Sequence, residues 1–413
     1  MVINFSKYNW ILILILSSSE LFSKETNLFL LLFILLYYVL VRGGRLPISI
    51  PGAKYYFTLL IVGLFIGIVN VIINENTVFN FVKHFIYYLL PLFFWQFGYI
   101  LSNKENLSCK PKNIKESIVI TAFLLSSYDL IGSIISFLSR TKEIVDLYSL
   151  RSEFGRGFYV PIIALYLVLF YSREIKLSKN FKRFLVLLFT ISILIHFSRT
   201  HFIILLILVF FSGFEKNMKN IKKIIFAGTL ILAGVGVLYL YFPNLVIDFY
   251  NKTSQSMTEI TFSKSSWSHK DIIWNWRGYE MYSALNHFKS SSFFEQILGG
   301  GFGTVLYMGE YAYLVSDLPY LLFLHNGYFT TLLVFGVSGV ILFVLWVLSL
   351  FGYSKYINNI QDSNFIKGLA VVILFTTYFV NGPLFSVSQA TFLLYFALFS
   401  NNHGELDEDF KKN

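Results

Sequence analysis

Charge is scarce in this chain, and cysteine is almost absent. Only 14% of the 413 residues are charged, whereas soluble domains carry about a quarter, and 56% are hydrophobic. The single cysteine, Cys109, excludes an intramolecular disulfide and a cysteine-based metal site. The sequence also lacks Walker, HExxH and DxD motifs and any acidic cluster of the kind that binds Mg²⁺ or Ca²⁺. We therefore expect an integral membrane protein that uses no metal, no cofactor and no cytosolic nucleotide.

The apolar runs are long and continuous. Because unpaired backbone groups are costly in lipid, spans are helices or closed barrels, and runs without alternation favour helices. A spanning helix needs about 20 apolar residues, and twelve segments are candidates: 8–23, 28–41, 55–73, 80–101, 117–139, 157–171, 183–197, 201–213, 223–242, 326–350, 366–381 and 385–400. The sequence predicts a single all-α polytopic membrane domain over residues 1–413, with its first span retained.

The positively charged residues lie mainly in the loops between the expected spans. The formal net charge is +10, but the Lys and Arg lie in short clusters between spans, which argues against nucleic-acid binding and is typical of cytoplasmic loops. With the N-terminus inside, twelve spans also return the C-terminus to the cytoplasm. This topology places the longest polar segment, 243–325, on the external face between spans nine and ten.

That external segment is the most informative part of the chain. Ser268 and Asp271 have the spacing of a capping box, which predicts a helix from about Lys270 to Phe288. Its tryptophans and tyrosines favour the headgroup layer, so we expect the helix to lie against the membrane surface. The glycines of 299–303 then predict a tight turn and the close approach of a ligand.

Arg199 lies between two apolar runs with almost no loop. An arginine at this place is costly unless it faces a polar cavity or an anionic partner. Alternatively, it ends a tight turn and extends its side chain to the interface, and charge placement alone leaves both interpretations open. His196 and His201 flank it, and each alone is more often a structural histidine at a helix end than a catalyst.

Two more candidates lie on the external segment. Arg277 could clamp a phosphate through its planar guanidinium, or form a surface ion pair with Glu280 three residues later. His325, which precedes Asn326 at the head of a span, could act as a general base, or cap the helix at the interface.

Arg151 and Arg156 lie in another external loop, just before a span. They could extend a positive funnel toward an anionic lipid-linked substrate, or be ordinary loop charge. Both interpretations fit the sequence.

In their order and context, these elements resemble the bacterial O-antigen polymerase and O-antigen ligase superfamily. The resemblance covers roughly residues 150–350. It rests on Ser198-Arg199-Thr200 between two spans, the arginine-containing helix Trp276–Leu285, the glycine-rich segment Leu298–Gly303, and His325-Asn326 at the head of a span that contains Phe335–Gly339.

The resemblance implies a metal-independent membrane glycosyltransferase whose donor is a glycan on undecaprenyl diphosphate. Arg199 and Arg277 would hold the diphosphate and stabilise its charge, and His325 would take the proton from the acceptor hydroxyl. Further substrate contacts are expected from Arg151, Arg156, His201, Glu280, Tyr282, Gly300, Gly301 and Asn326.

The resemblance also implies a setting and leaves the exact reaction open. The site would lie on the outer face of the bacterial inner (plasma) membrane, with a chain-length regulator and a flippase as further candidate partners. Phe158-Tyr-Val-Pro161 departs from the Asn-Pro that often stands here in ligase-type members, and the external segment is modest in size. We therefore expect a polymerase of O-antigen, capsule or similar polysaccharide. The alternatives are a ligase that transfers the chain to lipid A-core, a flippase for lipid-linked oligosaccharides, and a non-catalytic scaffold.

Overall fold

The computed structural model of the chain describes residues 7–22, 26–27, 29–33, 36, 50–73, 75–102, 111–139, 158–175, 177–196, 198–213, 228–229, 233–237, 239–241, 243–244, 246–248, 250–251, 254, 267–314 and 317–400. Its α-helices are α1 (Lys7–Leu21), α3 (Ala53–Ile72), α4 (Val78–Ser102), α5 (Pro111–Ser139), α7 (Val160–Phe170), α8 (Lys179–Ile195), α9 (Arg199–Gly213), α12 (His269–Trp274), α13 (Trp276–Ser290), α14 (Phe293–Leu298), α15 (Gly327–Tyr353), α16 (Ile360–Phe379) and α17 (Val387–Ser400). Two 3-10 turns, η1 (Gly309–Leu314) and η2 (Ser354–Tyr356), and two short antiparallel strands, β1 (Leu306–Tyr307) and β2 (Tyr320–Leu321), complete the description. The expected all-α class is confirmed.

Four of the described helices are long and apolar enough to cross a membrane: Ala53–Ile72, Val78–Ser102, Asn113–Ile135 and Gly327–Tyr356. They coincide with four of the twelve expected spans. Four more of the expected spans coincide with shorter apolar helices. Parts of the expected spans 28–41 and 223–242 lie outside the described residues. The structure is therefore that of a helical membrane protein, and the count of twelve spans stays a prediction.

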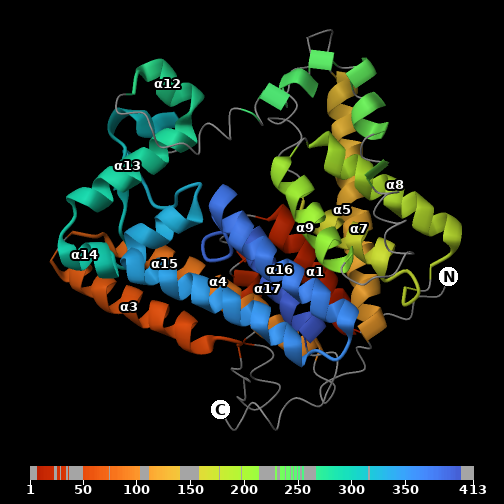
Figure 1. Cartoon of the computed structure of the whole chain (residues 1–413), viewed down its shortest axis with the longest axis horizontal. Coiled ribbons are helices and arrows are strands. Elements are labelled where there is room, and N and C mark those ends of the chain that lie inside the picture. The colour runs from red at the N-terminus through yellow and green to blue at the C-terminus, as the bar shows by residue number, and fades with distance from the viewer. Residues whose placement is uncertain are drawn as a thin grey trace.

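The helices form three groups side by side (Figure 1). α3, α12, α13 and α14 lie at one end of the molecule, and α5, α7, α8 and α9 lie at the other. α15, α16, α17 and α4 lie between them. Every residue of α7 is buried, as is nearly every residue of α17, and a helix that is apolar all round is expected to be surrounded by others.

α15 is broken in its first half. Gly336 has φ 67° and ψ −166°, so the helical hydrogen bonds stop there, and carbonyls of the preceding turn lose their partners. The glycine-rich segment supplies new ones, because the N–H groups of Gly300 and Gly301 donate to the carbonyls of Leu333 and Val334, each at 2.9 Å. A break at membrane depth is tolerated where neighbouring protein satisfies the freed groups in this way.

A buried ionic cluster ties α5 to α16 and to the turn after α7. Lys115 Nζ lies 2.5 Å from Glu174 Oε2 and 3.6 Å from Asp362 Oδ1. Tyr171 donates its hydroxyl to Asp362 Oδ1 at 2.7 Å. Lys115 and Asp362 are both 1% exposed, so the cluster is a fixed part of the helix packing.

The helix expected from about Lys270 to Phe288 is two helices. The capping box is present, with Asp271 N donating to Ser268 Oγ at 3.2 Å and Ser268 N to Asp271 Oδ2 at 3.4 Å. The helix ends after one and a half turns, because Asn275 adopts φ −120° and ψ 44°, and asparagine competes well with helical backbone bonding. α13 then begins at Trp276.

Candidate active site

His325 and Glu280 form a pair that joins the end of the external segment to α13. Glu280 Oε1 accepts the backbone N–H of His325 at 3.0 Å, and Glu280 Oε2 lies 2.9 Å from His325 Nδ1. The glutamate side chain is 1% exposed and the histidine side chain 24% exposed. The pair therefore has a buried acceptor and a partly open imidazole.

This geometry favours one tautomer of the neutral histidine ring. An ionised carboxylate only accepts hydrogen bonds, so a neutral imidazole that faces Glu280 Oε2 carries its proton on Nδ1. Nε2 of the neutral ring then carries a free lone pair. Nε2 has no hydrogen-bond partner among the described residues. A base whose tautomer is set by a carboxylate is a recurring arrangement in general base catalysis.

Asn326 places this pair at the start of α15. Its side-chain oxygen caps the helix by accepting Tyr328 N at 3.0 Å, and its amide nitrogen lies 3.5 Å from Met281 Sδ. Asn326 is 4% exposed. Asn326 therefore caps α15, and its expected contact with substrate stays a prediction.

The C-terminal end of α16 is the point on which the candidate residues converge. Gly327 N donates to Val380 O at 3.2 Å, which places the His325 turn against this end. Arg277 reaches the same end from α13, with Nη1 at 3.5 Å from Phe379 O. Arg277 and Gly327, which is two residues after His325, thus donate to neighbouring carbonyls at one helix terminus.

The register of α9 against α16 indicates the position of Arg199 relative to the C-terminal end of α16. α9 and α16 are antiparallel, because Leu208 packs at Gly368 while Ser212 and Phe365 both contact Tyr166. Arg199 lies nine residues before Leu208, which is about 13 Å of helix. The same distance from Gly368 leads to Thr377, two residues before the carbonyl that binds Arg277. Along the α9–α16 contact, Arg199 is thus expected at about the level of the end of α16 that Arg277 contacts.

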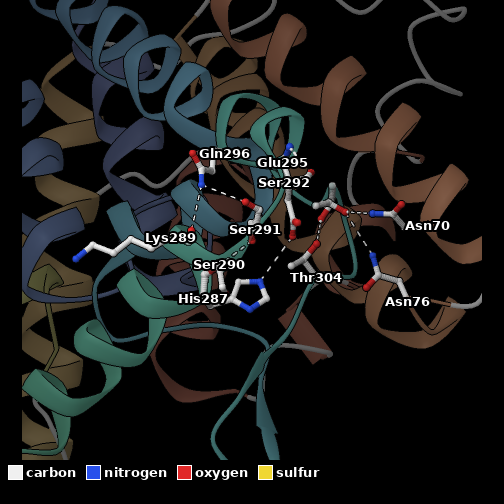
Figure 2. Close-up of polar contacts among 12 residues, drawn as sticks. Asn70, Asn76, His287, Lys289, Ser290, Ser291, Ser292, Glu295, Gln296 and Thr304 are labelled. Carbon is white, nitrogen blue, oxygen red and sulfur yellow. Dashed lines mark hydrogen bonds and ion pairs between the residues drawn. The ribbon is translucent and has the colours of Figure 1, made fainter. Parts of the chain in front are cut away.

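The glycine-rich segment is packed against protein. Ideal Cβ atoms on Gly300 and Gly301 would lie 2.4 Å from Thr304 Oγ1 and 2.2 Å from Gly67 N. Asn70 Nδ2 donates to Gly300 O at 2.7 Å, and Figure 2 shows Asn70, Asn76 and Thr304 converging on this segment. The expected close approach is real, but its partner is the backbone of α3 and α15. These glycines therefore have a packing role, and their expected contact with substrate stays a prediction.

His84 fixes the two ends of the hairpin that contains β1 and β2. Gly303 N donates to His84 Nδ1 at 2.9 Å, so the ring is neutral, and Nε2–H donates to Leu322 O at 3.0 Å. His84 is fully buried. Neither His84 nor Asn70 stands out in the sequence, because each is a single polar residue within an apolar helix.

The structure describes some of the remaining expected site residues but not all of them. His201 is 2% exposed, with its ring 5.3 Å from that of Tyr159 and 6.5 Å from that of His196, and its expected contact with substrate stays a prediction. Tyr282 is half-buried, with its ring 5.8 Å from that of Trp267. Arg151 and Arg156 lie outside the described residues. Among the described residues, no three His, Cys, Asp or Glu side chains gather as a metal site requires.

Part of the chain is similar to a known protein family. Residues 184–344 match a family model described as O-antigen ligase. The match runs from α8 into α15 and includes Arg199, Arg277, Glu280 and His325. No curated protein matches the chain.

Proposed function

We propose that the chain polymerises lipid-linked repeat units of a surface polysaccharide, on the basis of the match of residues 184–344 to a family model described as O-antigen ligase. Glycan transfer is the activity that the family supports. The finer proposal is that the donor is a growing glycan on undecaprenyl diphosphate. The acceptor would be a hydroxyl of the incoming lipid-linked unit, and transfer would take place on the outer face of the membrane.

The proposed reaction is a displacement at the anomeric carbon of the donor. The acceptor oxygen forms a bond to that carbon, and the bond from the carbon to the diphosphate oxygen breaks. The acceptor proton moves to Nε2 of His325, and undecaprenyl diphosphate leaves with the bonding electrons. Arg199 and Arg277 offer fixed positive charge to the diphosphate as its negative charge increases.

The observation that carries this proposal is the His325–Glu280 pair at the end of α16. Both glutamate oxygens are used to orient one residue, and that residue is more exposed than its partner. A scaffold protein needs no oriented histidine with an open nitrogen. A flippase is expected to concentrate its polar groups near mid-membrane between repeated halves, whereas His325 lies just before the start of α15 and Glu280 lies in the short helix α13.

The preference for polymerase over ligase rests on two features of the sequence. The external segment is modest in size, and Phe158-Tyr-Val-Pro161 stands where ligase-type members often have Asn-Pro. Glu280, which was expected to contact substrate, enters the proposal as the residue that orients His325.

The test uses cells that lack this protein and carry either the wild type or His325→Ala at equal membrane levels. Surface glycan is separated on a gel. A ladder with the wild type and a single capped repeat with the variant support the proposal. Long unattached chains on the carrier lipid in the deletion strain indicate a ligase, and repeat units trapped inside indicate a flippase. A normal ladder with His325→Ala removes the histidine from the mechanism.

A further inference from the structure

A second polar pair is buried where α5 meets α8, away from the His325–Glu280 pair. Asp129 Oδ2 lies 2.5 Å from His196 Nε2 and accepts the Ser192 hydroxyl at 3.1 Å. The side chains of Asp129 and His196 are 7% and 1% exposed. None of these three residues has a part in the reaction proposed above.

Stability alone does not account for the pair. Taking a carboxylate out of water is costly, and buried ion pairs are often no more stabilising than apolar residues of the same size. Within a membrane-spanning helix an ionisable residue is a functional hypothesis by default. The position of the pair in the fold indicates what it controls.

The two donors to Asp129 are one helical turn apart on α8. Ser192 and His196 are at positions i and i+4, so they lie on one face of the helix, and a single carboxylate oxygen holds both. This arrangement fixes the rotation of the last turn of α8 against α5. His196 is also the C-cap residue of α8.

Only a short turn separates α8 from α9. α8 ends at Ile195 and α9 begins at Arg199. A displacement of the α8 terminus therefore moves the first residue of α9 directly. Bidentate binding of phosphate oxygens by a guanidinium depends on the planar fork being correctly aimed.

We propose that Asp129, acting through His196 and Ser192, is a positioning residue that aims Arg199 at the diphosphate of the lipid-linked substrate. This inference rests on the proposed function, because it takes the diphosphate as the ligand of Arg199. It predicts that the contribution of Asp129 to ligand affinity exists only while Arg199 is present.

The experiment measures the affinity of the purified full chain in detergent for undecaprenyl diphosphate. Asp129→Asn is compared with the wild type, and the same change is then made in an Arg199→Ala background. Because small displacements of a binding group weaken its contact strongly, we expect Asp129→Asn to weaken binding about tenfold in the wild type. In the Arg199→Ala background it should have no further effect.

Asp362→Asn is the matched control. It alters a second buried carboxylate that also accepts a hydroxyl and faces a basic side chain, in the cluster with Tyr171 and Lys115. Affinity should be unchanged by this substitution in both backgrounds. Should Asp129→Asn fail to fold, Ser192→Ala removes one of the two donors, and its smaller loss of affinity should again depend on Arg199.

The outcomes separate the inference from the proposed function. The inference is overturned if Arg199→Ala weakens binding and Asp129→Asn does not, or if Asp129→Asn weakens binding equally in both backgrounds. If the wild type does not bind undecaprenyl diphosphate, or if Arg199→Ala leaves its affinity unchanged, the ligand assigned to Arg199 is wrong, and the proposed function fails with it.

Discussion

Glu280→Gln is the substitution that examines the His325 site most closely. Glutamine has nearly the shape of glutamate, but its amide offers one acceptor oxygen and one donor nitrogen. The native carboxylate accepts at both oxygens, from His325 N and at His325 Nδ1. If the amide oxygen keeps the backbone N–H, the amide nitrogen faces Nδ1 and donates to it. The ring then carries its proton on Nε2 and cannot take one from the acceptor.

The expected loss follows from that change of tautomer. General base catalysis contributes roughly 10²–10⁴-fold to rate, so Glu280→Gln should lower kcat by a factor in that range. This corresponds to about 2.7–5.4 kcal/mol in the activation free energy. Donor KM should change little, because the arginines that are proposed to bind the diphosphate are untouched.

The assay follows chain growth on purified protein with lipid-linked repeat units. Glu295→Gln is the matched control, because Glu295 also faces a histidine, His287 (Figure 2). The Glu295 carboxylate lies 3.7 Å from His287 Nε2, but both side chains are more than a third exposed. It should leave kcat unchanged. The double variant Glu280→Gln/His325→Ala should be no slower than His325→Ala alone, because residues that act as a unit are not additive. A Glu280→Gln enzyme within threefold of the wild type would refute the tautomer argument.

Three further predictions concern other parts of the fold. Arg199→Lys keeps the positive charge but loses the planar fork of the guanidinium. Because a charged hydrogen bond contributes about 1.5–3 kcal/mol, kcat/KM should fall roughly 10-fold to 100-fold. Steady-state kinetics at equal protein levels would disprove this if the lysine variant matched the wild type. Gly301→Ala places a methyl group 2.2 Å from Gly67 N, at a residue whose φ is 73°. The substitution should therefore lower the thermal stability of the detergent-solubilised protein. An unchanged melting temperature would contradict the packing role of Gly301. Lys115→Met leaves Asp362 buried without its cation, so unfolding should become easier by about 3 kcal/mol, and denaturant titration with no shift would exclude the cluster as a structural tie.

Local signals in the sequence predict local structure well. The capping box at Ser268 and Asp271 is present as expected, and Asn326 stands at the head of a long apolar helix. Four expected spans have helices of full length in the structure. These features depend on contacts between residues that are close in the chain, which spacing and composition record directly.

The site itself depends on contacts that spacing does not record. Glu280 and His325 are 45 residues apart in sequence, so a glutamate three residues after Arg277 was open to interpretation as its ion-pair partner. The glycine-rich segment has the composition of a ligand turn, yet its N–H groups complete the broken turn of α15. The interruption at Asn275 depends on one residue's dihedral angles within an otherwise helical pattern.

The central claim is that the chain extends a lipid-linked glycan with His325 as the base, and purified components test it most directly. The full protein in lipid vesicles is given undecaprenyl-diphosphate-linked repeat units, and both the glycan length and the released undecaprenyl diphosphate are measured. The account predicts that the wild type produces a ladder and releases one carrier per added unit, while His325→Ala produces neither. A wild type that leaves the native repeat unit unextended, or a His325→Ala variant that extends it at the wild-type rate, would contradict the account.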